Sequence, residues 1–127
     1  MPVTASALEV DVPVPKDSEI GRITYEYGEV AIAVVAGEKN VALVQFKGVR
    51  GVRILDEGDL LEFWPNCSRA YGWLFQISAG GWLELECSQP RFIRENYSTV
   101  REYLVTGDNE CVSIFSNQAP TVTANAL

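Results

Sequence analysis

The chain has 127 residues, 47% of them hydrophobic, which suits a single domain with its own core. Acidic residues outnumber basic ones by 17 to 10, histidine is absent, and the formal net charge is −7. A surface of this sign does not attract a phosphate backbone, which argues against a nucleic-acid partner. Without histidine the chain has no Ser-His-Asp or Cys-His catalytic pair, and it lacks the commonest zinc ligand.

Cysteine usage points to a reducing compartment. The three cysteines are odd in number and show no Cys-x-x-Cys spacing, which disfavours both a disulfide framework and a structural zinc site. Cys87 and Cys111 lie in apolar runs and are expected to be buried, whereas Cys67 is expected in an exposed loop. We expect no cofactor, no metal and no membrane partner, since no apolar run is long enough to cross a bilayer and no signal peptide is recognisable. The expected location is the cytoplasm.

Residues 1–19 are predicted to form an N-terminal arm or edge strand. Between residues 8 and 12, leucine and valine alternate with acidic residues, which is the period of a half-buried strand. Pro13 and Pro15 restrict such a strand to an edge or make the segment an extended leader. A flexible terminus is the open alternative.

Three apolar, β-branched runs follow at residues 20–27, 30–36 and 41–46. Glycine-containing turns separate them, and the second turn, residues 37–40, predicts a hairpin. In the two runs around it, odd-numbered and even-numbered positions are both apolar, so we expect central strands with both faces covered.

The middle of the chain is less regular. A glycine-valine-arginine triplet occurs twice in residues 48–53, and residues 56–64 have helical spacing that predicts a short helix stopped by Pro65. Residues 71–77 and 82–87 predict a second hairpin through Gly80-Gly81, because glycine supplies the positive φ angles of tight turns. Residues 90–100 are ambiguous, with spacing that also fits a short helix.

Residues 102–106 and 110–115 predict a third hairpin, with Asp108-Asn109 in its turn. We therefore predict one mainly β domain over residues 20–116, followed by a flexible tail at 117–127. Its seven or eight short antiparallel strands are expected to form a sandwich or a partly open barrel, with one or two short helices.

The second hairpin holds the candidate binding site. If its loop has two or four residues, Trp73 and Phe75 share a face with Trp82, Glu84 and Glu86. Indole rings are frequent anchors at protein interfaces, and carboxylates select basic partners. These five residues are the predicted binding residues, and no catalytic residue or metal ligand is predicted.

Other interpretations of these residues stay open. Both faces of the hairpin can be covered, in which case the rings belong to the core, and a three-residue loop would reverse the two faces. Glu84 and Glu86 would lie about 7 Å apart on one strand, a spacing that glycosidases use, but so short a chain leaves little room for their cleft.

Several segments resemble small uncharacterised bacterial single-domain β-rich proteins. The resemblance covers residues 48–64, Gly72-Trp73-Leu74-Phe75 with Gly80-Gly81-Trp82, and Glu102-Tyr103-Leu104 with Glu110-Cys111-Val112-Ser113. Some compact acidic proteins of this general kind act as immunity proteins against bacterial toxins. The resemblance thus implies a bacterial protein that binds another protein, and it carries over no functional residue.

The leading functional hypothesis is a non-enzymatic protein-binding module of immunity or inhibitor type, with a partner of basic character. The alternatives are a β module that binds a small molecule in an aromatic pocket, and a structural homo-oligomer joined through strand edges. No feature of the sequence favours an enzyme.

Overall fold

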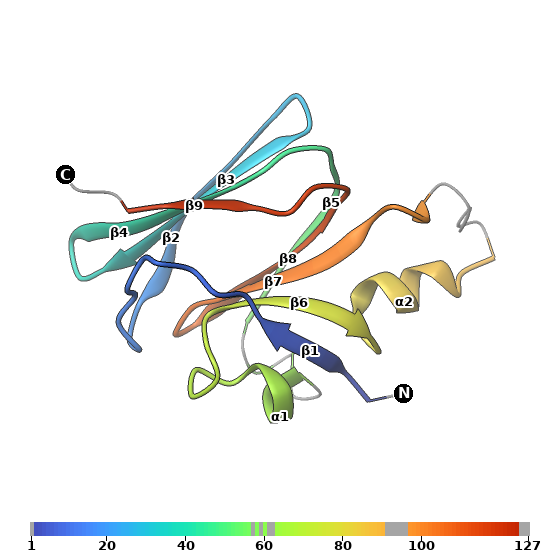
Figure 1. Ribbon diagram of the computed structural model, residues 1–127, viewed down its shortest axis with the longest axis horizontal. Coiled ribbons are helices and arrows are strands. Elements are labelled where there is room, and N and C mark those ends of the chain that lie inside the picture. The colour runs from blue at the N-terminus through green and yellow to red at the C-terminus, as the bar shows by residue number, and fades with distance from the viewer. Residues whose placement is uncertain (1, 57, 59, 61–62, 91–96, 125–127) are drawn as a thin grey trace.

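The computed structural model describes residues 2–56, 58, 60, 63–90 and 97–124. Within these residues the chain forms nine strands in two antiparallel sheets, together with two short helices, and neither sheet closes into a barrel. Figure 1 shows the two sheets as layers, with both helices beside the five-stranded one. The mainly β, sandwich-like fold expected from the sequence is confirmed, with one or two strands more than predicted.

The four-stranded sheet, sheet B, has the order β2-β3-β4-β9. Its strands are β2 (Glu19–Glu26), β3 (Glu29–Ala36), β4 (Lys39–Phe46) and β9 (Thr121–Thr123). The first three are the predicted apolar runs, and the β3–β4 hairpin turns at Gly37, whose φ is 63°.

Only one face of sheet B is covered. Alternate side chains of β3 and β4 point inward and are at most 1% exposed: Val30, Ile32, Val34, Ala42, Val44 and Phe46. Outward residues such as Ala31, Ala33 and Leu43 are half-buried, and Gln45 is exposed. The expectation that both faces of these strands are covered is therefore wrong for the outer face, whose side chains are half-buried or exposed.

The five-stranded sheet, sheet A, has the order β1-β6-β7-β8-β5. Its strands are β1 (Thr4–Ala7), β6 (Leu74–Ala79), β7 (Arg101–Thr106), β8 (Glu110–Ser116) and β5 (Val49–Asp56). The β7–β8 hairpin is the third predicted hairpin and is confirmed. Strand β5 was not predicted; it contains most of the two glycine-valine-arginine triplets and pairs with β8 from Val49 to Asp56.

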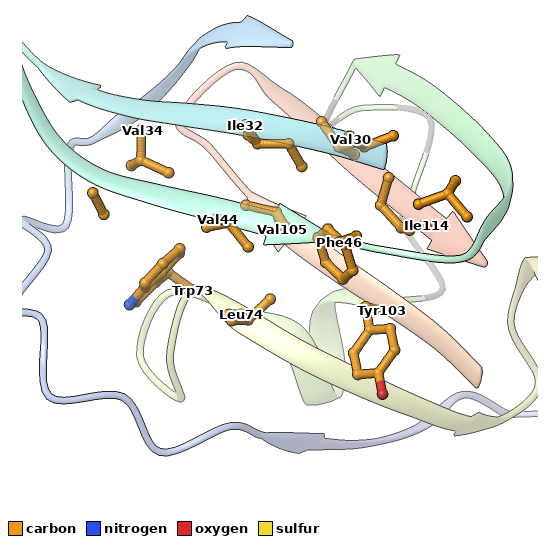
Figure 2. Close-up of a cluster of buried hydrophobic side chains, with 13 residues drawn as sticks. Val30, Ile32, Val34, Val44, Phe46, Trp73, Leu74, Tyr103, Val105 and Ile114 are labelled. Atoms are coloured by element: carbon orange, nitrogen blue, oxygen red, sulfur yellow. The ribbon is translucent and has the colours of Figure 1, made fainter. Parts of the chain in front are cut away.

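Two hydrophobic clusters lie on opposite faces of sheet A. The first fills the space between the sheets and includes Val44, Phe46, Trp73, Leu74 and Tyr103 (Figure 2). The second lies on the outer face, and its buried members are Val3, Leu60, Phe63, Cys67, Phe75, Ile77, Leu104 and Cys111. Sheet A is thus the middle layer of the molecule, which explains why β7 and β8 are buried on both parities.

The segment 8–18 crosses from sheet A to sheet B. Its leucine and valine side chains are half-buried against the first cluster, whereas the acidic residues and prolines between them are exposed. The predicted alternation is present, but the segment is an extended leader, and the edge strand lies earlier, at β1. Arg69 holds this crossing to the sheet, because its guanidinium donates hydrogen bonds to the carbonyls of Pro15, Ser18 and Thr106 and to Ser18 Oγ.

Helix α1 (Trp64–Cys67) begins where the sequence predicted that a helix would stop. Pro65 lies in its first turn, where a backbone N–H has no partner within the helix, so proline is tolerated there. Residues 57, 59, 61 and 62 of the predicted 56–64 helix lie outside the described residues, as do residues 91–96 of the ambiguous segment.

The prediction that Cys67 is exposed is also wrong. It is fully buried in the second cluster rather than exposed in a loop, because α1 packs it against the outer face of sheet A. Burial, with a smaller contribution from the charge of Glu102, raises the pKa of its thiol to about 12. Cys111 is buried as predicted, whereas Cys87 is only half-buried, and none of the three cysteines, all of which the structure describes, forms a disulfide.

The predicted flexible tail contains β9. Thr121–Thr123 pair with Leu43, Val44 and Gln45 of β4, and Val122 packs against the first cluster. These residues therefore belong to the sheet, because the unpaired edge of β4 offers them backbone partners. Residues 125–127 lie outside the described part of the chain.

Candidate functional site

The segment predicted as the second strand of the central hairpin is a helix, α2 (Trp82–Cys87). The predicted hairpin is therefore wrong. Strand β6 pairs instead with β1 on one side and β7 on the other, so no edge is left for residues 82–87. The chain turns at Gly80, whose φ is 76°, and α2 then folds back over the outer face of sheet A.

Gly81 allows this close approach of helix and sheet. A Cβ atom at this position would lie 2.6 Å from Glu102 Oε1 and 2.7 Å from Ile77 Cγ2. Both distances are shorter than any van der Waals contact, so a side chain at this position would displace Glu102 or Ile77. The paired glycines thus serve a strand-to-helix connection, in which one supplies the turn and the other supplies the space.

Two of the five predicted binding residues lie in the core, on opposite faces of sheet A. Trp73 is 9% exposed and packs between the sheets, where Figure 2 shows its ring near Val44 and Leu74. Phe75 is fully buried in the second cluster. Neither ring can meet a partner in the folded domain, and the two do not share a face because Trp73 precedes the first residue of β6.

The other three predicted residues, Trp82, Glu84 and Glu86, are brought together by α2. The Trp82 ring stacks on Phe115 with centroids 3.9 Å apart, and its Nε1 donates to Glu86 Oε1 over 3.0 Å. The Arg53 guanidinium lies 5.0 Å from the centre of the same indole. Trp82 therefore fastens one side of α2 to β8 and β5.

Glu102 anchors the N-terminal end of the same helix. Its Oε1 accepts the backbone N–H of Leu83 at 2.8 Å, and its Oε2 accepts that of Trp82 at 3.2 Å. The helix has no capping side chain of its own, so this carboxyl group from β7 satisfies two of its first N–H groups. Glu102 is only 1% exposed, and this burial raises its pKa, which the two N–H donors and the charge of Arg53 only partly offset.

Sequence reasoning missed Glu102. The available signal was a carboxylate in a run that is otherwise apolar on both parities, since a fully covered strand does not bury a charge without a partner. The hydrogen-bond partners of Glu102 could not be predicted, because they are the backbone N–H groups of Trp82 and Leu83, which lie in the segment that was predicted as a strand.

A pocket of about 510 Å³ opens between α2 and the end of β6. The lining includes Ile77, Leu83, Cys87, Tyr97, Glu84 and Glu102. Leu83 and Cys87 are four residues apart and therefore lie on one face of the helix, while Trp82 and Glu86 face Phe115. Glu84 is held in place at the rim, where it accepts the Gly80 N–H at 2.5 Å.

Neither a metal-binding cluster nor a membrane-spanning helix is found among the described residues. No group of three or more His, Cys, Asp or Glu side chains could hold a metal ion in the part of the chain that the structure describes. Over the same residues, no helix is both long enough and apolar enough to cross a membrane.

The comparisons with known proteins gave no relative: no family model, no curated protein and no solved structure matches the chain.

Proposed function

We propose that this protein is a non-enzymatic binding domain that holds a small organic molecule in the pocket beside α2. The observation that carries the proposal is a concave, partly apolar space of about 510 Å³ with a carboxyl group fixed in its wall. Pockets for small ligands have volumes in this range, roughly 300–1,000 Å³, and combine apolar walls with a few positioned polar groups.

The charge of the lining supports a ligand with an amine or another hydrogen-bond donor. Glu84 and Glu102 are the two carboxylic acids among the described lining residues, and none of these lining residues is basic. Ile77, Leu83 and the ring of Tyr97 would contact the apolar part of such a ligand. Because both oxygens of Glu102 already accept N–H groups, its position changes little on binding, which reduces the entropic cost of binding.

The absence of histidine and the use of Glu102 as a helix anchor both favour binding over catalysis. The three cysteines, all within the described residues, form no disulfide, which fits a reducing compartment, so the proposal places the domain in the cytoplasm. A protein partner of immunity or inhibitor type remains a second candidate, but not through Trp73 and Phe75, because they are buried.

The test compares one aromatic scaffold with three charges. Benzylamine, benzyl alcohol and benzoate are titrated into the protein while Trp fluorescence and amide NMR shifts are followed. We expect the ammonium compound to bind with a millimolar Kd and to perturb residues 77–87, benzyl alcohol to bind more weakly, and benzoate not to bind.

Leu83→Trp and Leu85→Trp form a matched pair of variants. Leu83 lines the pocket, so the larger ring should fill it and abolish binding, whereas Leu85 is 56% exposed and is not among the described residues that line it. Equal binding by both variants, or no binding of benzylamine to the wild type, would contradict the proposal.

A further inference from the structure

We propose that the turn between β2 and β3 is a second binding site, which docks a basic segment of a protein partner by taking a lysine or arginine side chain against Tyr27. The site is independent of the pocket beside α2, because it lies at one end of sheet B. Tyr27 projects there, with 93% of its surface exposed. Figure 1 shows this turn extending beyond the rest of the sandwich at the top of the view.

The turn presents Tyr27 in an unusual and fixed backbone conformation. Tyr27 has φ 51° and Gly28 has φ 79°, so both central residues of this two-residue turn are left-handed. Asparagine or glycine normally occupies the first of these positions, and a bulky side chain there is disfavoured. The turn is also tied to β5, because Val49 N–H donates to the Gly28 carbonyl at 2.9 Å. The exposed Tyr27 ring therefore projects from a turn that is hydrogen-bonded to β5.

A hollow of about 310 Å³ lies beside this ring. Its polar lining consists of Thr24, Glu26, Glu29 and Gln45, and Tyr27 closes one side. Glu26 and Glu29 are direct partners in the β2–β3 ladder, so their like charges face each other across the strands. Such a pair is destabilising unless a cation comes between the two carboxylates.

The chemistry of the hollow selects its occupant. The carboxylates and the amide oxygen of Gln45 accept hydrogen bonds, and an aromatic face attracts an ammonium or guanidinium group. Lys47 is exposed and follows Phe46, a lining residue, but Lys47 is not among the residues that line the hollow. The net charge of −7 would attract a basic partner over a longer range.

The acidic character of the whole protein favours a protein segment over a free cation. The hollow fits a single long side chain, and the formal net charge of −7 offers further acidic groups to the neighbouring residues of a basic segment. Tyrosine is a frequent anchor residue in protein interfaces because it offers a large rigid surface. A basic segment that fills the hollow and covers the Tyr27 ring would therefore gain more than a small cation does.

The experiment is an NMR titration with a tetra-arginine peptide, using a tetra-glutamate peptide and argininamide as reference ligands. We expect the tetra-arginine peptide to shift amides of residues 24–31 and 45, and to bind at least fivefold more tightly than argininamide. Shifts spread over all acidic surfaces would overturn the proposal. Equal affinity for argininamide would also overturn it, because the site would then be one for small cations.

Two variants and a control test the assignment of residues. Tyr27→Asn suits the turn conformation, so this variant should fold normally. It should nevertheless lower the affinity for the tetra-arginine peptide about threefold, because the aromatic ring is lost. The double variant Glu26→Gln with Glu29→Gln should lower the affinity for the peptide by more than threefold. Glu9→Gln with Asp11→Asn removes the same charge from an exposed part of the crossing segment and should leave the affinity within twofold. An equal loss in this control would show general charge attraction and refute the site.

Discussion

The β3–β4 turn and the β6–α2 turn each contain a glycine in the left-handed conformation, Gly37 with φ 63° and Gly80 with φ 76°. The first joins two strands of one sheet, whereas the second joins a strand to a helix that covers the sheet. Their surroundings differ. A Cβ on Gly37 would meet nothing within 4 Å, whereas a Cβ on Gly81, next to Gly80, would collide with Glu102. The first turn is determined locally, and the second depends on a residue from a distant strand.

The largest expected effect is at Gly81. Gly81→Ala places a methyl group against Glu102 and Ile77 and should lower the free energy of unfolding by about 3 kcal/mol, the upper part of the range for an overpacked site. Urea unfolding followed by far-UV circular dichroism measures this. A loss below about 1 kcal/mol would show that α2 can move away from sheet A without cost.

Trp82→Ala should come next, with a loss of about 2 kcal/mol, less than the 3–5 kcal/mol of a fully buried ring because Trp82 is only half-buried. The ring stacked on Phe115 is lost, and with it the attachment of α2 to β8. Trp82→Phe keeps an aromatic partner and serves as the control. If both variants lose equal stability in thermal unfolding, the stack is not what holds the helix.

Glu102→Gln should cost about 1–2 kcal/mol near neutral pH, because only one oxygen remains to accept the N–H groups of α2. The folded-state pKa of Glu102 is raised, so the native protein binds a proton more tightly than the unfolded chain does. This contribution to stability is therefore complete below the unfolded value of about 4.5 and is lost as the pH rises through the raised folded value.

The pH dependence itself is the sharper test. Unfolding free energies of the wild type and Glu102→Gln, measured from pH 4 to pH 8, should differ in slope, with the wild type losing more stability as the pH rises. Parallel curves would show that the carboxyl group titrates alike in the folded and unfolded states.

The smallest effect is expected at the locally determined turn. Gly37→Ala should cost about 1 kcal/mol, since the only penalty is the left-handed backbone and no neighbour is displaced. The ratio of the losses at Gly81 and Gly37, measured by the same urea titration, quantifies the contrast between the two turns. Equal losses of stability in the two variants would show that the two turns do not differ in this way.

Much of the fold was predictable because its strands have strong local patterns. The three strands of sheet B before residue 47 and the β7–β8 hairpin each combine a β-branched run with a turn residue, and these predictions are confirmed. Strand β5 gave no such pattern, because Gly51 and two arginines interrupt it. Gly51 is required where a Cβ would lie 2.7 Å from the Phe115 ring, a contact that only the pairing with β8 creates.

The candidate site was harder to predict for the same reason. The residues 82–87 form one helical turn and a half, too short for a periodic pattern, and their structure depends on Glu102 and Phe115, which lie on β7 and β8. Two predicted binding residues, Glu84 and Trp82, do lie at or beside the pocket, but as parts of a helix. The pocket residues Leu83, Cys87 and Tyr97 carried no signal in the sequence.

The Arg69 guanidinium, which bonds to Pro15, Ser18 and Thr106, has a consequence for how long the native state persists. Strand partners in this topology lie far apart along the chain, as Thr4 and Ala79 do, so folding is expected to be slow. The acceptors of Arg69 come together when the crossing segment lies against the sheet, so we expect these bonds to form after the rate-limiting step of folding. Bonds formed that late slow unfolding without speeding folding, so we expect Arg69 to prolong the lifetime of the folded molecule rather than to change the rate at which it forms.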